Sequence, residues 1–328
     1  MSVRVSAHIV WLASLSFCLS GCFEASPKRS VEVAKQGLYS ASLSRDGSHA
    51  VVGSIYHGAS LWESKGERIF NWNHTQGNYS EIVATAFSPE GAWAVTAEES
   101  NFVLWSTISG SASAYLQLPA EPMDLAASNQ ADLVAAALNN NTAVVYAAKK
   151  SSLVRTLRHQ DTVLTIDISE DGQLVLTGSE DDFAILWDLS TGKKVLEKRY
   201  EDDVVDVALS PSGRTAFVVA QYDKAEIWNT TNGKTLTTLP LSAQRLARGS
   251  RFTTAAFSDD DRLLLTGRPD QIVQLWSAET GKLLETWKLP KRDAWRPTSA
   301  SVLAVSFAKQ KGVFYAVASN GYLHELRQ

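Results

Sequence analysis

The chain has 328 residues, of which 45% are hydrophobic and 20% are charged, and its formal net charge is −4. This composition is typical of a folded globular protein and excludes long stretches of intrinsic disorder. A chain with a negative balance has no overall basic field that would attract nucleic acid, so we expect no nucleic-acid partner.

The first residues have the pattern of an export signal. Arg4 precedes an apolar run from Ile9 to Ser20. A run of about 12 residues is too short for a membrane-spanning helix, which needs roughly 20, but it fits the hydrophobic region of a secretory signal peptide. The run ends in Leu19-Ser20-Gly21-Cys22.

This tetrapeptide resembles the bacterial lipobox. The resemblance implies cleavage before Cys22 and lipid modification of its sulfur, and several acyl chains anchor a protein firmly where one would be marginal. We therefore expect a signal peptide over 1–21 and a lipidated tether over 22–29. Phe23 follows the cysteine, and the absence of Asp there implies an outer-membrane protein that faces the periplasm. An ordinary signal peptide that contains a cysteine is the alternative.

A repeat of 41 to 50 residues follows, and internal periods of this length indicate a repeat architecture. Each unit has a turn, in most units rich in Ser, Pro, Asp and Gly, such as 169–172, and degenerate in the seventh at 308–312. Each unit also ends a short apolar run on a large side chain. The run-ending residues are Trp62, Trp105, Tyr146, Trp187, Trp228, Trp276 and Leu326. In the fourth unit we expect strands a to c at 163–168, 174–179 and 184–187, and strand d around 195–196. The chain is therefore predicted to be all-β.

The units resemble WD40 repeats, and the resemblance covers residues 30–328. The fourth unit carries the family's structural set, His159, Ser179, Asp181 and Trp187, which in that family forms a buried hydrogen-bonded network. It is complete only in this unit, since Tyr56 and Glu99 replace the expected Asp in two others and Arg268 replaces the expected Ser in a third. The resemblance implies a seven-bladed β-propeller in which these residues are scaffold.

The ring needs a strand from the start of the domain. Only two residues follow Leu326, so the last blade lacks its outer strand d, and an unpaired edge would be exposed. The segment 30–35 alternates apolar and polar residues, and we expect it to supply this strand. The tether would then span at most about 25 Å. The top face, formed by the d–a and b–c loops, is expected to point away from the membrane.

Basic residues gather in two long connections of the predicted top face. We propose them as a partner-binding sector, because basic groups around an aromatic side chain suit an acidic protein surface or an anionic glycan. Two merely solvated loops are the alternative. The sector comprises Arg245, Arg248, Arg251, Arg268, Lys291, Arg292, Trp295 and Arg296.

No catalytic motif is present, and both cysteines, Cys18 and Cys22, lie in the first 22 residues. We therefore predict no catalytic residue, metal or cofactor, and a platform for protein–protein interactions in the bacterial envelope. The alternatives are a cell-wall glycan binder, or a small-ligand binder or enzyme that uses the central channel. Thr165, Asp167 and Asp206 are the few channel residues that favour the last. The partner and the oligomeric state stay open.

Overall fold

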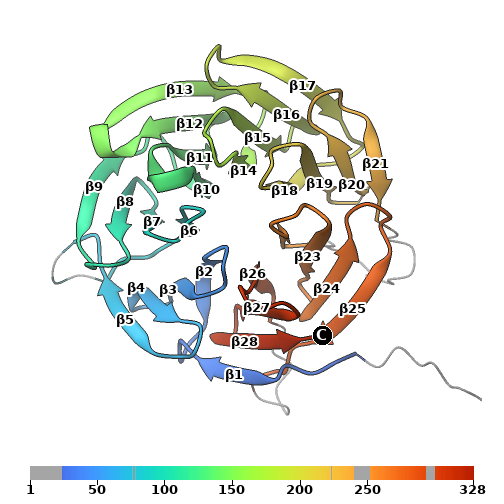
Figure 1. The fold of residues 1–328 in the computed structure, drawn as a ribbon. Coiled ribbons are helices and arrows are strands. Elements are labelled where there is room, and N and C mark those ends of the chain that lie inside the picture. Colours follow the sequence, from blue (N-terminus) through green and yellow to red (C-terminus); the bar gives the residue numbers. More distant parts are fainter. Residues whose placement is uncertain (1–23, 76, 78, 223, 240–251, 293–299) are drawn as a thin grey trace, which may run out of the picture.

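The computed structural model describes residues 24–75, 77, 79–222, 224–239, 252–292 and 300–328. Its strands form seven four-stranded antiparallel sheets that stand as blades around a central channel (Figure 1). The predicted all-β, seven-bladed propeller is therefore confirmed. Among the described residues there is no α-helix, only two 3₁₀ turns, η1 (Asn129–Ala131) and η2 (Ala148–Lys150). No described helix has the length and apolar character that crossing a membrane would require.

The blades follow one another along the chain, each from its innermost strand a to its outermost strand d. Blade 1 comprises β2 (Leu38–Leu43), β3 (His49–Ser54), β4 (Gly58–Glu63) and β5 (Arg68–Trp72). Blade 2 comprises β6 (Ala84–Phe87), β7 (Trp93–Glu98), β8 (Asn101–Ser106) and β9 (Ala112–Gln117). Blade 3 comprises β10 (Pro122–Ala127), β11 (Val134–Leu138), β12 (Thr142–Ala147) and β13 (Ser152–Arg158). Blade 4 comprises β14 (Val163–Ile168), β15 (Leu174–Ser179), β16 (Phe183–Asp188) and β17 (Lys193–Arg199).

The later blades have the same order. Blade 5 comprises β18 (Val204–Leu209), β19 (Thr215–Ala220), β20 (Ala225–Asn229) and β21 (Thr235–Thr238). Blade 6 comprises β22 (Thr254–Phe257), β23 (Leu263–Gly267), β24 (Ile272–Ser277) and β25 (Leu283–Lys288). Blade 7 comprises β26 (Val302–Phe307), β27 (Val313–Ala318), β28 (Tyr322–Arg327) and β1 (Arg29–Glu32).

The middle strands of each blade are apolar on both faces because each sheet lies between two others. All five residues of β11 are buried, for example, and its Ala135 packs with residues of blade 4 such as Ile166. The a–b turns join these strands tightly. In blade 4 the Ser169 hydroxyl donates to Asp171 at 2.6 Å and accepts the Leu174 N–H, while Gly172 adopts φ +70°. A side chain at this φ would be strained, which explains the glycine.

Strand β1 closes the ring, as predicted. It pairs antiparallel with β28, with Arg29 opposite Glu325 and Glu32 opposite Tyr322. The strand covers 29–32 and not 30–35, because beyond it Val33 and Ala34 donate their N–H groups to the Gly321 carbonyl.

Part of the predicted tether is also ordered against the propeller. Ala25 forms a parallel bridge with Trp287 in β25: its N–H donates to the Thr286 carbonyl and its carbonyl accepts the Lys288 N–H, both at 2.9 Å. Lys28 donates its N–H to Glu325. The chain thus lies along the outer edges of blades 6 and 7 before it enters β1.

Candidate functional site

The two faces of the propeller differ in the loops that form them. In an antiparallel four-stranded blade, the a–b and c–d turns lie at one end and the b–c turns and the connections between blades at the other. We call these ends the bottom face and the top face. Side chains inside the blades are committed to packing, so binding surfaces are expected on these faces or in the channel.

The network of blade 4 uses a different hydroxyl from the predicted one. His159 bonds to the Asp181 carboxylate through Nδ1 at 2.9 Å and to the Thr177 hydroxyl through Nε2 at 2.8 Å, and Trp187 Nε1 donates to the same hydroxyl. Ser179 instead donates to the Asp161 carbonyl. Thr177 and Ser179 lie two positions apart on one strand, so they point to the same side. Burial lowers the pKa of His159, and the Asp181 carboxylate partly offsets this effect.

Blade 2 holds a second network of this kind. His74 bonds to Asn101 and, at 2.7 Å, to Thr96, whose hydroxyl also accepts the Trp105 Nε1–H at 2.8 Å. This second network was not predicted. Its histidine bonds to Asn101, which lies two residues after the Glu99 that stands in the expected Asp position. Both histidines are fully buried, so the geometry supports a scaffold role.

The predicted basic sector is only partly a surface. Arg268 is 4% exposed and binds the Asp270 carboxylate through Nε at 2.9 Å and through its terminal nitrogen at 2.8 Å. The prediction that Arg268 is an exposed binding residue is wrong, because its buried guanidinium is paired with the Asp270 carboxylate. Lys291 is exposed. The remaining members, apart from Arg292, lie outside the described residues: Arg245, Arg248, Arg251, Trp295 and Arg296.

Arg292 holds the ring closure together. It donates to the carbonyls of Ala34 and Asn320, both at 3.0 Å, and to the Glu32 carboxylate at 2.5 Å. Its guanidinium also lies 5.7 Å from the centre of the Tyr322 ring. These contacts connect the closing strand to blade 7, so this side chain serves the fold.

Four aromatic side chains around blade 1 form a surface that the sequence analysis did not identify. We call Tyr39, Tyr56, His57 and Tyr79 the tyrosine patch; the three tyrosines are 45%, 70% and 74% exposed. The rings of His57 and Tyr79 lie 6.0 Å apart. The Glu81 carboxylate lies close enough to Tyr39 to raise the pKa of its hydroxyl, and Tyr56 adds to this effect. The patch belongs to the top face because its members lie in b–c and d–a loops or at the start of strand a.

Tyr56 has a backbone conformation that bulky residues rarely adopt. Its φ is +66°, and a large side chain in the left-handed region costs free energy. The b–c turns of blades 3, 4 and 6 place Asn141, Asp182 and Gln271 in this region. Blade 1 instead presents an exposed aromatic ring, and such local strain is typical of functional positions.

Carboxylates border the tyrosine patch. Glu81, Glu98, Glu99 and Glu121 line a hollow of about 350 Å³. Within the described residues none of these four pairs with Lys or Arg; Glu98 lies 3.6 Å from His74, whose pKa is lowered by burial. Further along the same face, burial and then the neighbouring Asp202 raise the pKa of Asp203. The top face is therefore acidic from blade 2 to blade 5, which favours a basic partner surface.

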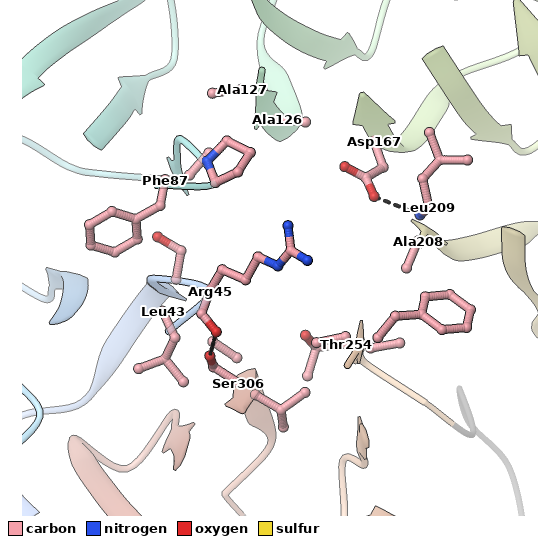
Figure 2. A pocket seen from close by; sticks show the side chains of 18 of the residues that line it. Leu43, Arg45, Phe87, Ala126, Ala127, Asp167, Ala208, Leu209, Thr254 and Ser306 are labelled. Carbon is pink, nitrogen blue, oxygen red and sulfur yellow. Dashed lines mark hydrogen bonds between the residues drawn. The ribbon is translucent and has the colours of Figure 1, made fainter. Parts of the chain in front are cut away.

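The central channel holds a cavity of about 350 Å³ lined by the a strands of all seven blades. Figure 2 shows Arg45, from the a–b turn of blade 1, extending into it. Its guanidinium pairs with Glu170 of blade 4 and, at 2.9 Å, with Asp259 of blade 6. Arg45 thus lies across the bottom mouth.

Besides Glu170, three aspartates among the described residues line this cavity: the predicted Asp167 and Asp206, and Asp124, which was not predicted. Asp167 accepts the Leu209 N–H of the next blade at 2.7 Å (Figure 2), and Asp124 accepts that of Ile166 at 3.0 Å. Burial raises the pKa of Asp124 to about 6 and of Asp167 to about 7, and raises that of Asp206 well above its ordinary value. In the described part of the chain no three His, Cys, Asp or Glu side chains are placed to hold a metal ion.

Comparison with known families gives one match. Residues 151–188 and 243–277 match the model of the WD domain, G-beta repeat. The first segment runs from strand d of blade 3 through strand c of blade 4, and the second ends with strand c of blade 6. No curated protein matches the chain.

Proposed function

Since the chain carries WD40 repeats arranged as a seven-bladed propeller, we propose that it is a lipid-anchored interaction platform of the bacterial envelope that holds another protein on its top face. Propellers built of these repeats commonly mediate protein–protein interactions, and most are scaffolds without catalytic activity.

The observation that carries the proposal is the tyrosine patch. Tyrosine combines a large apolar ring with a polar tip and is enriched among the residues that dominate binding energy at interfaces. Tyr56 and Tyr79 are each at least 70% exposed, and they gather with Tyr39 on one face instead of being scattered singly. The acidic hollow beside them selects a partner of opposite charge and speeds its association.

The lipobox supports the anchoring. If Cys22 is the first residue of the mature protein, only Phe23 and Glu24 lie between it and Ala25, which is hydrogen-bonded to blade 6. The three Cα–Cα steps from Cys22 to Ala25 span at most about 11 Å. The lipid would therefore hold the outer edge of blades 6 and 7 close to the outer membrane, on its periplasmic side, while the top face stays open to periplasmic proteins.

The test compares partner capture by a variant of the tyrosine patch with capture by a variant of the bottom face. The triple variant Tyr39→Ser, Tyr56→Ser and Tyr79→Ser is expected to capture its partner at least about tenfold less well than the natural chain, since each hot-spot residue contributes about 2 kcal/mol. Capture is measured by affinity purification and quantitative mass spectrometry after crosslinking in intact cells. The control is Ile108→Ser, which changes an 83% exposed side chain in a c–d turn of the bottom face. Equal capture by both variants would place the interface elsewhere.

A further inference from the structure

Polar atoms without partners line the channel on two sides. The Asp206 Oδ2 atom of blade 5 is buried and accepts no hydrogen bond, and the hydroxyls of Ser42 and Thr85 are also buried without a partner. All three residues line the same cavity, and Thr85 is only 9% exposed. Buried polar groups are nearly always hydrogen-bonded in folded proteins, so each of these atoms is a place where a ligand can donate.

These groups lie on opposite sides of the channel. Ser42 and Thr85 belong to β2 and β6 of blades 1 and 2, and Asp206 belongs to β18 of blade 5, across the ring (Figure 1). Asp124 on β10 and Asp167 on β14 also line the channel, near enough to Asp206 for their charges to act on it. One wall is therefore acidic, and the other offers neutral hydroxyl groups.

The cation that the chain itself places in the channel does not neutralise this wall. Arg45 is held at the bottom mouth by Glu170 and Asp259, while Asp206 is near the charges of Asp124 and Asp167 and has no cationic partner among the described residues. A positively charged donor beside Asp206 would offset this repulsion. The donor is an organic ammonium and not a metal ion, because the described residues offer no metal-binding group.

We propose that the channel binds a small aliphatic diamine, with one ammonium on the Asp206 carboxylate and the other on the hydroxyls of Ser42 and Thr85. An ammonium has three N–H donors and no acceptor, which matches an unpaired carboxylate oxygen and hydroxyl oxygens. A volume of about 350 Å³ lies within the range of small-ligand sites. This site is independent of the tyrosine patch, so the two proposals stand or fall separately.

Calorimetric titration of the full chain with 1,5-diaminopentane at pH 8 tests the proposal. We expect saturable binding of one molecule per chain and no binding of the neutral 1,5-pentanediol. Asp206→Asn removes the charge without changing the shape and is expected to weaken binding at least about tenfold, as loss of a charge-assisted hydrogen bond should. Thr85→Ala, on the opposite wall, is expected to weaken it severalfold.

The control is Glu99→Gln, which removes an exposed carboxylate of the acidic hollow outside the channel and is expected to leave the affinity unchanged. Melting curves of each variant establish that it is folded before titration. Absence of saturable binding, or equal affinity in folded Asp206→Asn and the natural chain, would overturn the proposal. Loss of binding in Glu99→Gln alone would also overturn it, because the amine would then bind the top face.

Discussion

A variant that lacks Arg29–Glu32 is expected to melt at least about 10 °C below the complete chain. Removal of β1 leaves the edge of β28 unpaired and uncovers the buried Val33 and Leu323, which pack in one apolar cluster. Ladder hydrogen bonds contribute about 1 kcal/mol each, and for a domain of this size each kcal/mol lowers the melting temperature by roughly 2–4 °C. The deletion also removes the Ser30 hydroxyl that bonds to His324 at 2.8 Å.

Circular dichroism melting curves measure this effect, and a peptide of residues 29–35 provides the control. Added in excess to the deleted chain, the peptide is expected to restore part of the lost melting temperature, since binding to the folded state alone stabilises it. A peptide of the same composition in scrambled order is expected to restore nothing. If the chain without Arg29–Glu32 has the same melting temperature as the complete chain, the strand does not hold the ring closed.

The stability of the propeller is expected to fall as the pH rises from about 4 to 8, through the channel carboxyls. Their pKa values are above the ordinary 3.8 in the folded chain, at about 6 for Asp124 and about 7 for Asp167. The folded state therefore binds more protons at these carboxyls in this range than the unfolded state, so their contribution to the free energy of unfolding is greatest near pH 4 and decreases through pH 6 to 7. At about 1.4 kcal/mol per pKa unit, Asp167 alone accounts for a loss of unfolding free energy on the order of 4 kcal/mol between pH 4 and pH 8.

Asp206→Asn isolates this effect. Asp206 Oδ2 accepts no hydrogen bond, so an amide nitrogen there meets no opposing donor, whereas at Asp167 it would face an N–H group. The variant is expected to be more stable than the natural chain at pH 8 and equally stable at pH 4. Urea unfolding at several pH values measures the difference, with the exposed Glu99→Gln as control. Equal stability of Asp206→Asn and the natural chain at pH 8 would show that no ionised carboxylate is buried there.

Buried His324 opposes this trend in the natural chain, as do His74 and His159, whose pKa values burial also lowers. Burial lowers the pKa of His324 from 6.5 to about 4, so the folded state binds fewer protons there than the unfolded state and stability is lost as the pH falls from 6.5 toward 4. The comparison between Asp206→Asn and the natural chain cancels these contributions, since both contain all three histidines.

The spacing of the large side chains from Trp62 to Leu326 was sufficient to predict seven blades, because each marks the same buried place in one repeat. Closure by an N-terminal strand was predicted from the alternation of apolar and polar residues over 30–35, and the pairing of β1 with β28 confirms it. The hydroxyl in the blade 4 network was misplaced because Thr177 and Ser179 face the same side of one strand, and only coordinates distinguish them.

The candidate surfaces were harder to predict because their members are distant in sequence. Arg292 forms an ion pair with Glu32, which lies near the other end of the chain, and no local sequence pattern indicates that pairing. The tyrosine patch combines residues from three places: the start of strand β2, the b–c turn of blade 1, and the connection from blade 1 to blade 2. Asp124 could have been found, since it holds the same place in strand β10 that Thr165 and Asp206 hold in β14 and β18.

The central claim is that the top face around blade 1 contacts another protein in the cell. Its most direct test is a photoreactive amino acid placed at Tyr56 and, separately, at Ile108, in the otherwise natural chain of living cells. Illumination is expected to crosslink a protein from position 56 and not from position 108. Crosslinks from position 108 alone, or from neither position, would contradict the claim.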